Sequence, residues 1–188
     1  IDRLREELAK LPLPGYRIET RGVTRSGLAA TKVDVVAEGP SPAHRHLRHI
    51  LELLEASGLE AEVKGRAAAL FRRLAEAEAA VHGTSVEKVH FHEVGAVDSI
   101  VDIVGGVIAL RWLGAGRFVA SPLNVGTGTV TMSHGTFPVP PPATAKLVAG
   151  VPVYGEGEGE LLTPTGALLV TAHATEYGPL PPMRIEAT

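Results

Sequence analysis

The sequence predicts a mixed α/β fold, with a mixed sheet, packed helices and one central buried helix. Short β-rich segments alternate along the chain with segments of helical periodicity, an order typical of sheets that helices cover. The segment 97–113 is apolar on nearly every side, as in a helix buried all round. The length of 188 residues, 45% of them hydrophobic, favours a single domain over 1–188.

The first half of the chain is expected to form small helical and β units. A turn signal at Arg25-Ser26-Gly27 separates two β-rich runs and predicts a hairpin. Ser41-Pro42 is typical of a helix start, and His82-Gly83 of a helix end. The predicted elements are a helix over 2–10, strands over 18–23 and 31–35, and a helical hairpin within 38–83.

The second half combines the buried helix with short strands and loops. Residues 126–129 are expected to form a Gly/Thr loop, and 155–160 a mobile acidic loop. The predicted elements are an extended segment over 89–94, the helix over 97–113, strands over 117–121, 130–132 and 151–154, and helices over 143–148 and 163–177.

Composition and charge exclude several classes of protein. Lys and Arg number 18 against 21 Asp and Glu, and this net charge of −3 argues against a nucleic-acid-binding domain. Cysteine is absent, so disulfides and thiolate metal sites are excluded. No apolar run is long enough to span a membrane, and the N-terminal pattern is an amphipathic helix rather than a signal peptide. We therefore expect a cytoplasmic protein.

The clearest candidate site is a cluster of histidines and carboxylates in the middle of the chain. In an extended segment His90 and His92 share one face, and Glu93 can join them through a bend at Gly95. Asp98 and Asp102 share one face of the following helix. Imidazole and carboxylate together suit a borderline metal such as nickel, zinc, cobalt or manganese. Alternatively, the histidines lie on the surface, Asp98 is the N-cap residue of the helix, and Asp102 lies favourably near the positive end of the helix.

The other histidines carry weaker signals. His44, His46 and His49 form a metal-capture patch or a solvated helix start, and Arg45 and Arg48 beside them could hold an anion.

Two isolated histidines and two threonine-containing loops complete the candidates. His82 suits a helix C-terminus, whereas His134 lies in a loop, where functional residues are common. The loops offer amides and hydroxyls to a phosphate, or are simply a turn and a helix cap; their threonines are Thr127, Thr129, Thr163 and Thr165.

Four ordered blocks of sequence closely resemble the LarC family of nickel insertion proteins. The blocks are residues 75–83, 89–105, 133–140 and 160–167. The resemblance implies nickel insertion into pyridinium bis-thiocarboxylic acid mononucleotide, which yields the nickel-pincer cofactor of lactate racemase. It further implies a lyase-class chelatase that consumes CTP, giving CMP and pyrophosphate, with Mn²⁺ or Mg²⁺.

The chain differs from the full family pattern at both ends. The family's opening strand before Ile1 and its CTP-associated C-terminal domain after Thr188 are absent from the sequence, so we expect a fragment of the first half. Expected partners are the mononucleotide, the family's own C-terminal domain and a second copy of the chain.

Chemistry assigns roles to the candidate residues within that activity. His90, His92, Asp98 and Asp102 are the expected nickel ligands, and Thr127, Thr129, Thr163 and Thr165 the expected phosphate ligands. Glu93, Asp98 or His134 would accept the ring proton that is lost when the carbon–nickel bond forms. The alternatives are a non-catalytic nickel carrier, an assembly module and, more distantly, a metal-dependent phosphohydrolase.

Overall fold

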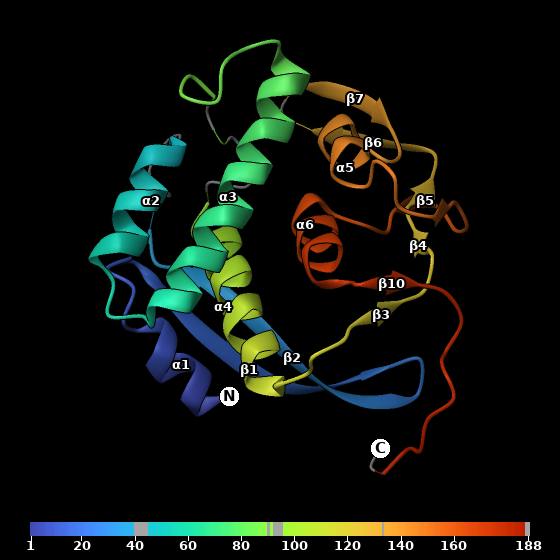
Figure 1. The fold of residues 1–188 in the computed structure, drawn as a ribbon, viewed down its shortest axis with the longest axis horizontal. Coiled ribbons are helices and arrows are strands. Elements are labelled where there is room, and N and C mark those ends of the chain that lie inside the picture. Colours follow the sequence, from blue (N-terminus) through green and yellow to red (C-terminus); the bar gives the residue numbers. More distant parts are fainter. Residues whose placement is uncertain (40–44, 90, 92–95, 133, 187–188) are drawn as a thin grey trace. The chain divides into compact units, whose positions relative to one another are not determined.

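The computed structural model describes residues 1–39, 45–89, 91, 96–132 and 134–186 (Figure 1). The chain divides into two compact units, Ile1–Trp112 and Leu113–Thr188. The predicted mixed α/β class is confirmed, because helices and strands occur in both units. In the described part of the chain, no helix combines the length and the apolar character needed to cross a membrane.

The first unit contains a long antiparallel hairpin and a set of helices. The strands β1 and β2 pair from Tyr16↔Ala37 to Arg25↔Leu28, so the predicted hairpin is confirmed. Ser26 and Gly27 join them with φ values of 48° and 83°, the left-handed conformation of a type I′ turn. The elements are α1 (Asp2–Leu8), β1 (Tyr16–Arg25), β2 (Leu28–Ala37), α2 (Leu47–Ala56), α3 (Ala61–His82) and α4 (Val97–Leu113).

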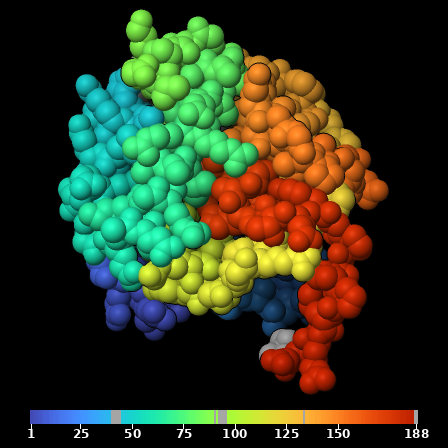
Figure 2. All heavy atoms as spheres, in the orientation of Figure 1, coloured from blue at the N-terminus to red at the C-terminus, as the bar shows by residue number. Residues whose placement is uncertain are grey.

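The helices α2 and α3 pack against each other and confirm the predicted helical hairpin; Figure 2 shows their atoms together on one face. The helix α2 begins later than the sequence indicates. Ser41-Pro42 lies outside the described residues, but Arg45 forms an isolated β-bridge with Phe91, and His46 is an extended N-cap residue. The helix Leu47–Ala56 therefore does not extend back to Ser41-Pro42, because Arg45 is used in a long-range backbone pairing.

The helix α4 supplies much of the hydrophobic core of the first unit. Its bounds agree with the prediction, and Ile100, Ile103 and Val104 are completely buried. The expectation that this helix is buried all round is wrong, because Asp98 and Asp102 lie on an exposed stripe. Apolar residues thus cover most of the circumference of α4. The stripe that carries Asp98 and Asp102 stays in contact with solvent.

Among its described residues, the second unit is built from four short strand pairs, two parallel and two antiparallel. The predicted mixture of parallel and antiparallel pairing is therefore present, distributed over small two-stranded sheets. The elements are β3 (Val119–Ala120), β4 (Leu123–Asn124), β5 (Gly126–Thr127), β6 (Thr129–Met132), β7 (Gly135–Pro138), α5 (Pro142–Leu147), β8 (Val153–Tyr154), β9 (Gly159–Glu160), α6 (Pro164–His173) and β10 (Glu176–Tyr177).

The last helix is shorter than predicted because its C-terminal neighbours pair with a strand. α6 ends at His173, and Thr175 donates both its backbone N–H and its hydroxyl to the carbonyl of Phe118. The strand β10 then runs parallel to β3. These non-local hydrogen bonds outweigh the local helical pattern.

The acidic loop 155–160 is held in place by Asn124. The side chain of Asn124 donates to the carbonyl of Glu156 at 3.0 Å and accepts from the amides of Glu156 and Gly126. Within the same loop, β9 pairs with β5. The expectation of a mobile loop is therefore wrong, because the loop is hydrogen-bonded to Asn124 and to β5. The pairing of β5 with β9 brings the two backbones close together.

We predict that Gly126→Ala strongly destabilises the second unit. A Cβ at residue 126 would overlap the carbonyl oxygen of Gly159, and the φ of Gly126 is +85°. Gly128→Ala is the matched control, because Gly128 has a φ of +87° but no neighbouring atom within 4 Å of the added Cβ. Denaturant unfolding should show a loss of about 1 kcal/mol for the control and about 3 kcal/mol for Gly126→Ala. Equal losses would contradict the proposed close packing.

Candidate functional site

The predicted metal-binding cluster is divided between described and undescribed parts of the chain. Three of its residues, His90, His92 and Glu93, lie outside the described residues. Asp98 and Asp102 occupy the first two turns of α4 and are both exposed. The prediction that these two carboxylates share one helix face is confirmed.

One oxygen of Asp98 is used in a local hydrogen bond. Its Oδ1 atom accepts the backbone N–H of Ser99 at 2.8 Å. This contact satisfies one of the free amides at the start of the helix. The interpretation of Asp98 as the N-cap residue is wrong, because Asp98 is already the second residue of α4. Asp98 is an exposed residue, so this contact and a metal-binding role are compatible.

Asp102 lies in a less favourable environment for a negative charge. Partial burial raises the pKa of its carboxyl group, and the negative charge of Asp98 raises it further. The two carboxylates lie four residues apart on α4, a spacing at which like charges repel each other. A divalent cation would remove this repulsion, because it favours the charged form of both groups.

An isolated β-bridge joins Arg45 to Phe91. Phe91 is 1% exposed, and its backbone N–H donates to the carbonyl of Arg45 at 3.2 Å. Burial lowers the pKa of the Arg45 guanidinium. Arg45, which precedes His46 in the chain, is therefore paired with Phe91. Sequence analysis missed this relation, since only the types of these residues were visible and not their pairing.

The described histidines outside the cluster have structural contacts. The His46 amide approaches Nδ1 of His49 at 3.4 Å, and the two rings meet edge to face. His82 lies in the last turn of α3, 3.6 Å from Glu78, as its helix C-terminal interpretation predicts. His134 is exposed between β6 and β7. Among the described residues, no group of three or more His, Asp or Glu side chains could hold a metal ion.

The four candidate phosphate-binding threonines differ in their availability. The hydroxyl of Thr127 donates to the carbonyl of Gly157 at 2.7 Å, which ties β5 to the acidic loop. The Thr163 hydroxyl accepts the amide of Gly166 at 3.2 Å and caps α6, so its proton stays available. Thr129 is exposed and Thr165 is half-buried in the first turn of α6. The start of α6 therefore offers more free donors than the Gly/Thr loop.

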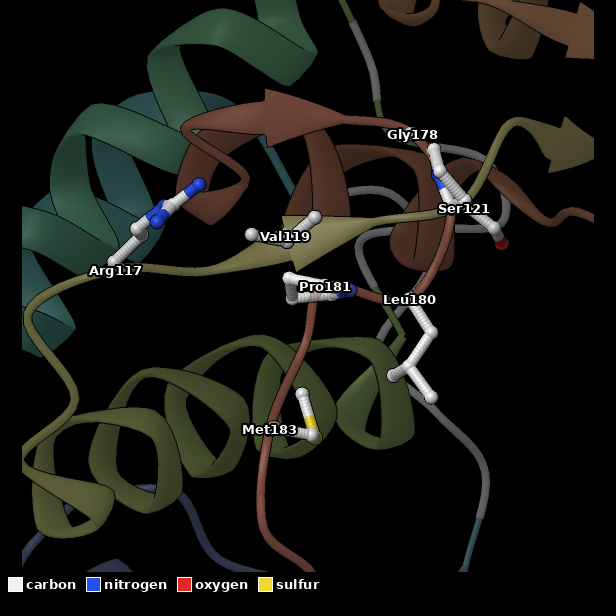
Figure 3. Close-up of a pocket in the computed structure, with 8 residues that line it drawn as sticks. Arg117, Val119, Ser121, Gly178, Leu180, Pro181 and Met183 are labelled. Atoms are coloured by element: carbon white, nitrogen blue, oxygen red, sulfur yellow. The ribbon is translucent and has the colours of Figure 1, made fainter.

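An open pocket of about 380 Å³ lies in the second unit, between β3 and the tail that follows β10 (Figure 3). Val119, Leu180 and Met183 give it apolar walls. Arg117 lines it too and forms an ion pair with Glu176 at 2.5 Å. None of the predicted site residues lines this pocket, so it gives no support to the candidate metal or phosphate positions.

The comparisons with known proteins give one consistent result. A family model described as nickel insertion protein matches residues 1–188. A protein of Desulfitobacterium hafniense strain DCB-2, named pyridinium-3,5-bisthiocarboxylic acid mononucleotide nickel insertion protein, is 48% identical over 97% of this chain and 46% of its own length. No solved structure matches the chain.

Two further relatives carry provisional names as nickel insertion proteins. The relative from Citrifermentans bemidjiense is 53% identical over 97% of this chain and 48% of its own length. The relative from Dictyoglomus thermophilum is 40% identical over 99% of this chain and 48% of its own length. The chain thus spans about half the length of the curated relatives that it matches.

We predict that Asp102→Asn stabilises the folded chain at neutral pH. Folding raises the pKa of Asp102, so the ionised carboxylate lowers the free energy of unfolding at pH values above its folded-state pKa. This cost disappears at low pH, where Asp102 is protonated in both the folded and the unfolded chain. The variant should gain a few tenths of a kcal/mol at pH 7, or about 1 °C in Tm, and no gain should remain below about pH 4. Thermal unfolding across this pH range tests the prediction, and a loss of stability at pH 7 would contradict it.

Proposed function

The chain belongs to the nickel insertion protein family, and we propose that it contributes to nickel insertion into pyridinium-3,5-bisthiocarboxylic acid mononucleotide. The nickel ion is cargo in this reaction, and the mononucleotide is the acceptor. The product would be the nickel-pincer cofactor of lactate racemase, and the activity that of a lyase-class chelatase. The continuous family match over 1–188 supports treating these residues as one functional domain.

The observation that carries the proposal is the exposed carboxylate pair on α4. We assign Asp98 and Asp102, together with His90 and His92, as the nickel ligands. The pair supports this assignment because its charges repel each other in the metal-free chain and would be neutralised by a cation. Imidazole nitrogens and carboxylate oxygens are suitable ligands for Ni²⁺.

Insertion into the ring requires a proton acceptor. The ring carbon loses its proton as its bond to nickel forms, and the two sulfurs complete the grip on the metal. A carboxylate at the cluster, Glu93 or Asp98, would accept this proton, with His134 as the alternative base.

The mononucleotide also needs a phosphate-binding position. We favour the start of α6, where the hydroxyls of Thr163 and Thr165 lie at the positive end of a ten-residue helix. Thr129, together with Thr127, is the second candidate position. Thr127 is the weaker donor because its hydroxyl proton is directed at Gly157.

The proposed co-substrate and location rest on the resemblance to the family alone. CTP, with Mn²⁺ or Mg²⁺, is the proposed co-substrate of the complete reaction, and the cytoplasm is the proposed location. The alternative function is that of a nickel carrier or an assembly module. A carrier would bind nickel with or without the mononucleotide, whereas an assembly module would have no tight nickel site.

We predict that removing the proposed ligands weakens nickel binding without unfolding the chain. Calorimetric titration with Ni²⁺ should show at least about a 10-fold loss of affinity for Asp102→Asn, and a larger loss for His90→Ala combined with His92→Ala. Asp102→Asn is the more informative variant, because its stability should rise while its nickel affinity falls.

His82→Ala serves as the control, because His82 is a histidine outside the proposed ligand set and contacts Glu78. Its nickel affinity should equal that of the unmodified chain. Repeating the titration with the thiolated mononucleotide separates the alternatives, since an insertion protein binds this compound and a pure carrier does not. Unchanged nickel affinity in both ligand variants would refute the proposed site.

A further inference from the structure

The hairpin β1–β2 has two edges, and its register identifies the backbone groups on each. Gly15 accepts the amide of Glu38 at 2.7 Å, one step beyond the pair Tyr16↔Ala37. Bonded pairs alternate in an antiparallel ladder, so the even-numbered residues of β2 bond to β1. The odd-numbered residues of β2 direct their N–H and C=O groups outward; they are Ala29, Thr31, Val33, Val35 and Ala37.

In the described part of the chain, another element forms hydrogen bonds to the edge of β1 but not to the edge of β2 between Ala29 and Val35. The side chain of Arg5, on α1, donates to the outward carbonyl of Ile18 at 3.3 Å and to the hydroxyl of Thr20. Among the described residues, no hydrogen bond reaches an outward backbone group of β2 between Ala29 and Val35. Val33, in the middle of this edge, is 48% exposed. Figure 1 shows the two strands as a long ribbon. An open edge of this length is a template for pairing with another strand.

The charges on the hairpin are arranged unfavourably within one chain. Arg21 lies directly opposite Lys32, and Glu19 directly opposite Asp34. Directly opposed like charges destabilise a strand pair. Diagonal and same-strand contacts offset this in part, since Asp34 lies 2.6 Å from Lys32 and 3.3 Å from Arg21. Each hairpin therefore presents a positive row beside a negative row at the open edge.

We propose that β2 pairs with β2 of a second copy of this chain, antiparallel, with Val33 opposite Val33 of that copy. In this register Lys32 of each copy lies opposite Asp34 of the other. The row of Arg21 and Lys32 in one hairpin then lies next to the row of Glu19 and Asp34 in the second copy. The twofold axis repeats this arrangement with the two copies exchanged. The outward groups of both strands find partners at the same time.

The charges also exclude the neighbouring registers. Hydrogen bonds between the two copies form only where residues with outward N–H and C=O groups face each other. The register can therefore shift only by steps that keep odd-numbered residues of β2 opposite odd-numbered residues. A shift one way places Lys32 opposite Lys32, and a shift the other way places Asp34 opposite Asp34. The charge pattern thus selects a second copy in one register, rather than an arbitrary strand.

A charge-swap experiment tests the pairing on the full chain. By sedimentation equilibrium, Lys32→Asp and Asp34→Lys should each raise the dimer dissociation constant at least about 10-fold, because each variant opposes like charges. The variant that combines both substitutions should restore dimerisation. Arg25→Asp is the control, because Arg25 belongs to β1, away from the proposed interface, and should leave dimerisation unchanged.

The absence of cysteine allows a second, independent test. Val33→Cys should form an intermolecular disulfide under mild oxidation, since the opposed Cα atoms would lie about 5.5 Å apart. Ala29→Cys is equally part of the open edge but would lie about 27 Å from its counterpart, and should stay reduced. A monomeric chain, equal cross-linking of both cysteine variants, or failure of the double charge swap to restore dimers would overturn the proposal.

Discussion

The burial of α4 is the constraint on which the candidate site depends. Its apolar side chains occupy the core, and full burial of each contributes about 1.5–3 kcal/mol relative to exposure. Repulsion between Asp98 and Asp102 costs only a few tenths of a kcal/mol. The core therefore fixes the orientation of the helix, and the two carboxylates must occupy the stripe that remains exposed. The repulsion between Asp98 and Asp102 thus falls on an exposed stripe, where a bound cation would turn it into attraction.

Elements with a strong local pattern could be predicted from the sequence, and elements made by long-range pairing could not. The bounds of α4 follow from its apolar composition, and the β1–β2 turn follows from Ser26-Gly27. In contrast, the bridge between Arg45 and Phe91 delays the start of α2, and the contact of Thr175 with Phe118 ends α6 early. Both depend on segments far apart in the sequence, which periodicity does not relate.

The same distinction applies to the candidate site. Helical spacing alone predicted that Asp98 and Asp102 share a face, but their exposure required knowledge of what packs around α4. For Thr127 the residue type indicated a phosphate ligand, whereas the structure gives its hydroxyl an internal acceptor at Gly157. A side chain's chemistry is therefore visible in the sequence, but competition from the chain's own backbone is not.

The central claim is that the middle of this chain binds nickel through imidazole and carboxylate groups. X-ray absorption at the nickel edge, recorded on the chain loaded with one equivalent of Ni²⁺, tests it most directly. The account predicts mixed nitrogen and oxygen ligation with the multiple scattering of imidazole rings, lost when His90 and His92 are both replaced by alanine. An all-oxygen shell that is the same in both samples would contradict it.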